Sequence, residues 1–117
     1  MVSTHLTDDT FDEFLRRTPG TVIVTFHAPW CADCKRVQPV LASLPERYPH
    51  IRFADVDTEE AMEVAARFDI RGIPTLLVFE GGRLVDRLYS REAKWPQEIL
   101  DFVAEVAGAA DTRTTAG

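Results

Sequence analysis

The apolar residues of this 117-residue chain recur with two periods, which predict an alternation of strands and helices. A nearly unbroken apolar run, typical of a strand buried on both faces, occupies residues 21–27, and a second strand is predicted over 74–80. A shorter run over 51–56 predicts a third strand, and two glycines after residue 80 predict a tight turn into an antiparallel partner over 83–90. Apolar residues three or four positions apart predict helices over residues 8–17, 35–48, 59–68 and 96–107.

The ends of these helices carry recognisable signals. Thr7 is expected to cap the first helix, and Asp8 and Asp9 lie at its positive end. Thr58 is expected to cap the third helix in the same way. Pro39 lies inside the second helix, where it should produce a kink because its ring removes a backbone donor.

This order of elements predicts a layered α/β domain, with parallel strands crossed by helices and an antiparallel hairpin near the end. The length fits a single domain, which we place at residues 1–107, and an apolar content of 45% is enough for a packed core. Residues 108–117 have the composition of a flexible C-terminal tail. We expect the protein to be a monomer.

Charge and hydropathy exclude some classes of partner. The net charge of −6 argues against a nucleic-acid-binding surface, which needs clustered lysine and arginine. No apolar run approaches the roughly 18 residues that span a bilayer, so no membrane association is expected. The N-terminus lacks the basic and then apolar pattern of a signal peptide, and we therefore expect a cytoplasmic location.

Both cysteines lie in one Cys-x-x-Cys motif, Cys31 and Cys34, directly after a buried strand and at the start of a helix. A helix N-terminus favours a thiolate, which is the species that attacks disulfides. Cys34 lies one turn further on, where it can attack a mixed disulfide on Cys31. An inert buried pair and a structural zinc site are weaker interpretations. Zinc needs four ligands, and the remaining candidates, His5, His27 and His50, are scattered, so no metal is expected.

Two segments around these residues, "FHAPWCADCKRVQP" and "RGIPTLLVFEGG", together resemble thioredoxin. The N-terminal "HLTDDTFDEFL" is also similar to the start of thioredoxin, so the resemblance covers about residues 5–107. It implies a thioredoxin fold, a single three-layer α/β/α domain with a mixed central sheet. It also implies that the segment around Ser3–Leu6 is an edge strand of that sheet.

The resemblance assigns roles to individual residues. It implies that Cys31 is the exposed nucleophile and Cys34 the buried resolving thiol. Trp30 is expected to border the substrate surface. Pro74 is expected to follow Ile73 through a cis bond and to face the cysteines, where it offers the substrate a backbone edge and keeps metals away from the thiols.

The chain departs from the family pattern on two neighbouring strands. The central strand of thioredoxin usually carries a buried Asp that helps to deprotonate the resolving thiol, and the matching residue here is Thr25. The adjacent strand usually carries a Lys, and the matching residue here is Asp55. We hypothesise that Asp55 replaces the lost acid. Strand periodicity puts it on the same face as Phe53 and Asp57; the alternative is that these acids are simply solvated.

Further departures lie near the cysteines. Asp33 replaces the usual Pro of the motif; its charge disfavours a second negative charge on Cys31 and should make the protein reducing, unless it serves only the helix N-terminus. His27 replaces an aromatic residue and could tune Cys31 or be inert. Ser90 stands where a groove glycine is usual, and residues 90–96 form either a partner-specific rim or a solvated loop.

These features predict a thioredoxin-like protein-disulfide reductase that needs no bound cofactor. Its substrates are expected to be disulfide-containing proteins, and the family implies a thioredoxin-reductase-like flavoenzyme as electron donor. The alternative from another class is a thioredoxin-fold protein-interaction module with little turnover. A peroxidase is less favoured, because the Arg and Thr that usually surround a peroxidatic cysteine are missing.

Overall fold

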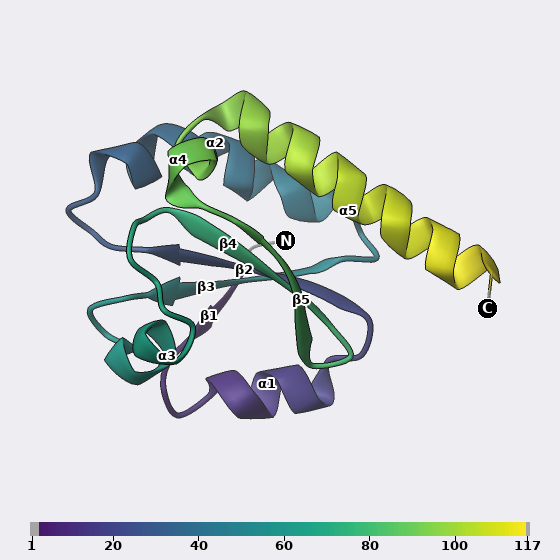
Figure 1. Cartoon of the computed structure of the whole chain (residues 1–117), viewed down its shortest axis with the longest axis horizontal. Helices are drawn as coiled ribbons and strands as arrows, with labels where there is room; N and C mark the ends of the chain where they lie inside the picture. The colour runs from purple at the N-terminus through teal and green to yellow at the C-terminus, as the bar shows by residue number, and fades with distance from the viewer. Residues whose placement is uncertain (1–2, 117) are drawn as a thin grey trace.

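The computed structural model describes residues 3–116, with side chains as far as residue 110. Its centre is a five-stranded sheet in the order β1-β3-β2-β4-β5 (Figure 1). The first three of these run parallel, while β4 pairs antiparallel with both β2 and β5. The sheet is therefore mixed, as predicted. The strands are β1 Thr4–Leu6, β2 Thr21–His27, β3 Arg52–Asp57, β4 Thr75–Glu80 and β5 Arg83–Leu88.

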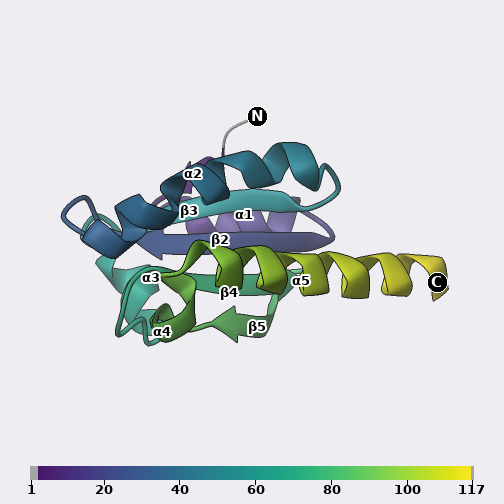
Figure 2. The same cartoon turned by 90° about the horizontal axis from the view of Figure 1, so that it is seen from above.

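Helices cover both faces of the sheet, which gives the three-layer arrangement that the resemblance implied (Figures 1 and 2). The face of α1 and α3 packs on one apolar cluster, and the face of α2 and α5 packs on a second. A short helix, α4, links β5 to α5. Within the described residues, no helix is both long and apolar enough to cross a membrane. The helices are α1 Phe11–Arg17, α2 Ala32–Arg47, α3 Met62–Arg67, α4 Ser90–Ala93 and α5 Pro96–Ala116.

The central strand β2 has the predicted bounds, and all of its residues except the last are buried, as an almost continuous apolar run predicts. Its alternate residues feed the two apolar clusters: Val22 and Val24 face α1 and α3, whereas Ile23 faces α2 and α5. The edge strand β1 also lies where the resemblance implied, paired in parallel with β3. This pairing matters for the site, because it sets His5 opposite Asp55.

The N-terminus of α1 differs from the prediction. The helix begins at Phe11 rather than at residue 8, and Thr10 rather than Thr7 is the residue before its first turn. Asp8 instead reaches another helix: its carboxylate accepts the backbone N–H of Val64 at 2.9 Å and that of Glu63 at 3.3 Å. Asp8 therefore caps α3, whose first turn holds both donors.

Three further helix ends differ from the predicted ones. The third helix begins at Met62, so Thr58 does not cap it. The second begins at Ala32, directly after Cys31, and stays helical through Pro39. The last continues to Ala116, past residue 107, where the composition predicted a tail. The domain boundary at residue 107 stays a prediction.

Candidate functional site

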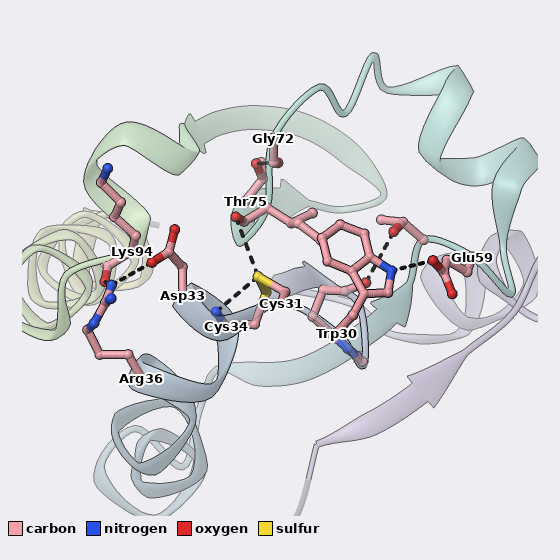
Figure 3. The surroundings of a disulfide bond; sticks show 12 residues. Trp30, Cys31, Asp33, Cys34, Arg36, Glu59, Gly72, Thr75 and Lys94 are labelled. Carbon is pink, nitrogen blue, oxygen red and sulfur yellow. Dashed lines mark hydrogen bonds and ion pairs between the residues drawn. A yellow bond between two sulfur atoms is a disulfide. The ribbon is translucent and has the colours of Figure 1, made fainter.

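The two cysteines lie at the N-terminus of α2, shortly after the C-terminal end of the central strand β2 (Figure 3). Cys31 is the N-cap residue and forms a disulfide with Cys34, with 5.2 Å between their Cα atoms. The backbone N–H of Cys34 donates to the Cys31 sulfur at 3.1 Å. An N–H donor and the positive end of a 16-residue helix both favour negative charge on that sulfur.

The two cysteines are nearly equal in burial. Cys31 is 5% exposed and Cys34 is 7% exposed, so the expectation that Cys31 is the exposed member is wrong for this disulfide state. The cause is local packing, because Ala28 and Ile73 close over the pair. The position of Cys31 at the helix N-terminus, not its exposure, is what distinguishes it from Cys34.

The segment before β4 lies against the disulfide. The Ile73–Pro74 peptide bond is cis, and the carbonyl oxygen of Ile73 lies 3.7 Å from the Cys31 sulfur. The hydroxyl of Thr75 donates to the carbonyl of Gly72 at 2.6 Å, and this hydrogen bond joins the two ends of the segment 72–75. The Ile73 carbonyl therefore faces the sulfur predicted to react.

Trp30 directly precedes Cys31 and is 66% exposed. Its indole N–H donates to the carboxylate of Glu59 (Figure 3), which fixes the direction of the ring. An exposed tryptophan held in one orientation next to a disulfide is suited to contact a bound protein. That Trp30 borders the substrate surface stays a prediction.

Asp33 is paired, which changes the interpretation of its charge. Its carboxylate accepts from Arg36 at 2.7 Å, one turn along α2, and Arg36 also donates to the backbone carbonyl of Lys94 at 3.1 Å (Figure 3). The guanidinium further lies over the Trp95 ring, 5.0 Å from its centroid. Arg36 compensates part of the Asp33 charge, so its predicted effect on Cys31 is weakened.

A cavity of about 290 Å³ lies between α2 and the sheet, on the inner side of the disulfide. Pro74 and residues of α2, among them Cys34, line it on one side, and residues of β2 and β3 line it on the other, together with Ser3 just before β1. The side chains that carry chemistry along its wall are Ser3, Thr25, His27, Cys34, Gln38 and Asp55. The acid at Asp55 therefore shares a cavity with the resolving cysteine, as the hypothesis of a displaced acid requires.

Asp55 is the centre of a hydrogen-bonded cluster that sequence reasoning missed. Its Oδ1 accepts from Nδ1 of His5 at 2.6 Å and from Nε2 of His27 at 2.9 Å, and its Oδ2 accepts from the Ser3 hydroxyl at 3.2 Å. The second ring nitrogen of His5 donates to Glu60 at 2.6 Å. His27 is therefore directed at Asp55.

The cluster shifts two pKa values. Burial acts to raise the pKa of Asp55, but hydrogen bonds from His27 and His5 outweigh it and hold the pKa below the usual range. Hydrogen bonds to Asp55 and then to Glu60 raise the pKa of His5 above its ordinary value. Asp55 is thus ionised at neutral pH, and it is a weaker base than an unpaired carboxylate.

The sequence could not show this cluster, because it depends on the register of three strands. His5 lies opposite Asp55 across β1 and β3, and Asp55 lies opposite Thr25 on β2, two residues before His27. All of these side chains point toward α2. The expectation that the histidines are scattered is therefore wrong for His5 and His27, which lie together at Asp55.

Ser90 lies at the start of α4 and not at the end of the last strand, so that part of the predicted strand is wrong. The segment 90–96 likewise begins with a turn of helix whose Ala93 is buried, and is more than a solvated loop. Ser90 faces Gly72: a Cβ built on Gly72 would lie 2.3 Å from the Ser90 hydroxyl oxygen.

Comparison with known proteins gives one consistent family. The thioredoxin family model matches residues 2–105. The chain is 40% identical over 83 residues to Thioredoxin 1 of Nostoc sp., covering 70% of this chain and 78% of that protein. It is 37% identical over 111 residues to protein disulfide-isomerase A4 of Mus musculus, covering 92% of this chain but 17% of that protein.

Solved structures agree on the fold. Mitochondrial thioredoxin 3 of Saccharomyces cerevisiae, in its oxidised form, superposes with a TM-score of 0.78 at 25% identity, over 88% of this chain and 94% of that one. Fasciola hepatica thioredoxin superposes with a TM-score of 0.79 at 24% identity, over 87% of this chain and 97% of that one.

Proposed function

The chain belongs to the thioredoxin family, and we propose that it is a thiol-disulfide oxidoreductase that reduces disulfide bonds in protein substrates. The observation that carries this proposal is the Cys31–Cys34 disulfide at the N-terminus of α2, with the Ile73 carbonyl beside it. Similarity to proteins named thioredoxin and protein disulfide-isomerase supports the same activity.

In the proposed reaction, the Cys31 thiolate attacks one sulfur of the substrate disulfide, and the other substrate sulfur leaves as a thiolate that takes up a proton. Cys34 then loses its proton and attacks the Cys31 sulfur in the mixed disulfide, which releases the second substrate thiolate. Two electrons pass from the dithiol to the substrate. The protein ends in the disulfide state that the structure describes, and no bound cofactor takes part.

The substrate is proposed to bind along Trp30 and the Ile73–Pro74 segment. The Ile73 carbonyl faces the reacting sulfur, so an extended substrate backbone that donates to this segment would lie across Cys31. The exposed face of Trp30 would cover apolar side chains next to the substrate disulfide.

Asp55 is proposed to take the place of the acid missing at Thr25. Its carboxylate lines the same cavity as Cys34 and is ionised, so it can accept a proton from the Cys34 thiol through water. Its lowered pKa limits this role, because a weaker base accepts a proton from the thiol less readily. The variant Asp55→Asn should slow the resolving step, and an unchanged rate of reduction across pH would remove Asp55 from the mechanism.

Insulin reduction with dithiothreitol as electron source tests the activity. The protein should accelerate insulin precipitation, and Cys31→Ser should abolish this effect. A rate no higher than dithiothreitol alone would instead favour the interaction module with little turnover. Cys34→Ser should trap substrates as mixed disulfides on Cys31, and mass spectrometry of these adducts would identify the substrates.

The electron donor is proposed to be a thioredoxin-reductase-like flavoenzyme. Oxidation of NADPH in the presence of such an enzyme and the oxidised protein would support it. No NADPH oxidation by a protein that is active with dithiothreitol would count against it. The proposed cytoplasmic location is a separate question, and fractionation of cells that produce the protein would answer it.

A further inference from the structure

We propose that His5, His27 and Asp55 form a binding site for a divalent first-row transition ion, with zinc as the probe. This proposal does not rest on thiol exchange, but a zinc ion at Asp55 would occupy the carboxylate that is proposed to accept the Cys34 proton. The three side chains come from the three adjacent strands β1, β2 and β3, and each offers one ligand atom. These atoms lie within 4.8 Å of one another. The rigid sheet therefore gathers the ligands before any ion arrives.

The distances within the cluster suit this role. Zinc is bound by nitrogen and oxygen at about 2.0–2.2 Å, which in tetrahedral geometry places neighbouring ligand atoms about 3.3–3.5 Å apart. The two histidine nitrogens lie 2.6 and 2.9 Å from Oδ1 of Asp55, so each of these two distances must increase by less than about 1 Å to admit an ion. The two nitrogens lie within 4.8 Å of each other. His5 allows this movement because its side chain is half exposed on a short edge strand.

Neighbouring groups orient the ligands. Glu60 accepts from Nε2 of His5, so the other ring nitrogen, Nδ1, is the one that faces Asp55. The Ser3 hydroxyl donates to Oδ2 of Asp55, which leaves Oδ1 turned to the two histidines. A carboxylate behind a histidine ligand is the usual outer partner in metal sites, and such partners fix the ring and its tautomer.

The donor set indicates the class of ion. Two imidazoles and one carboxylate suit zinc and its neighbours, whereas magnesium and calcium prefer all-oxygen sites. Three protein ligands leave a position for water or a small molecule. That position has room, because His27 and Asp55 line the cavity that also contains Cys34.

The alternative is a hydrogen-bonded network in which protons occupy the space between the rings and the carboxylate. The two cases differ in one measurable property, zinc binding by the disulfide form. In that form neither cysteine is a thiol, so zinc capture by Cys31 and Cys34 cannot contribute. Failure of the proposed reductase activity would not alter this result, because no turnover is measured.

The experiment uses the full, untagged chain after oxidation, with the absence of free thiols verified by a thiol reagent. Zinc is titrated against a chromogenic chelator, and cobalt is added separately to record its visible absorption bands. We expect one zinc per chain and cobalt bands of a site with fewer than six ligands. His5→Ala, His27→Ala and Asp55→Asn should each abolish binding or weaken it at least about tenfold, and Glu60→Gln should weaken it about tenfold.

His50→Ala is the matched control, because His50 is the remaining histidine and lies outside the cluster. It should leave zinc affinity unchanged. Circular dichroism of each variant confirms folding, and the exposed position of His5 makes His5→Ala the variant least prone to unfold. The proposal is overturned if the oxidised protein binds no zinc, or if His5→Ala and His27→Ala bind it as well as the unchanged chain.

Discussion

The contact between Gly72 and Ser90 gives a sharp test of how the segment next to Cys31 is held. Gly72 precedes Ile73, and Ser90 begins α4. A Cβ added at Gly72 would lie 2.3 Å from the Ser90 hydroxyl oxygen and 3.1 Å from the Ser90 Cβ. The hydroxyl can rotate away, but the Ser90 Cβ is fixed to the backbone of α4. The second contact therefore sets the cost of Gly72→Ala.

Overpacking of this kind costs about 1–3 kcal/mol. We therefore expect Gly72→Ala to lower the free energy of unfolding by about 2 kcal/mol, which moves the urea midpoint by roughly 1 M for a slope near 2 kcal/mol/M. Ser90→Ala in the same chain relieves only the hydroxyl contact, which rotation can also relieve, and should restore little of the loss. Ser90→Gly removes both contacts and should restore most of it, less the cost of about 0.5–1 kcal/mol for glycine in a helix.

Urea unfolding of the single and double variants, followed by circular dichroism, measures the coupling between the two positions. Gly108→Ala is the control, because a Cβ at Gly108 meets no atom within 4 Å and alanine favours the helix there. It should be neutral or stabilising. Additive effects of Gly72→Ala and Ser90→Gly would refute the reasoning, because they would mean that the two residues do not press on one another.

Three further predictions concern charged residues. Asp8→Ala should lower the free energy of unfolding by about 1 kcal/mol in urea denaturation, because it removes the cap of α3. Asp12→Asn should cost about 0.2–1 kcal/mol at pH 7, because it breaks the exposed ion pair with Arg67. Since Arg67 lowers the pKa of Asp12, this difference is fully present above the ordinary pKa near 4. It should shrink in melts at lower pH and disappear once Asp12 is protonated in the folded chain as well. Asp33→Asn should raise the potential of the Cys31 disulfide by less than about 30 mV against glutathione, and a fall would contradict the predicted sign.

The strands were predictable because each carries its own pattern. The run over 21–27 is apolar at almost every position and became β2 with the same bounds. The hairpin of β4 and β5 follows from its two glycines, both of which adopt positive φ. Helix starts were less predictable, because the residue that caps α3 is Asp8, more than fifty positions away. A local signal at Thr58 cannot report such a partner.

The candidate site was also predictable only in part. The cysteine pair and the Ile73–Pro74 segment belong to short motifs, so the sequence located them. The pairing of Asp33 with Arg36 was also within reach, since three positions along a helix bring side chains together. The contact of His5 with Asp55 was not, because it requires the register between an edge strand of three residues and its neighbour.

That register also explains what a displaced acid means for Cys34. Thr25 lies directly opposite Asp55 on the neighbouring strand. The carboxylate of Asp55 is therefore displaced by one strand spacing, about 4.8 Å, from the place that an acid at position 25 would have. The alternation of side chains keeps it on the face toward α2 and within the cavity of Cys34. The sideways step also brings it within hydrogen-bonding distance of His5, on the edge strand. Asp55 is therefore a carboxylate paired with two histidines, and this pairing keeps it charged at the expense of its strength as a base.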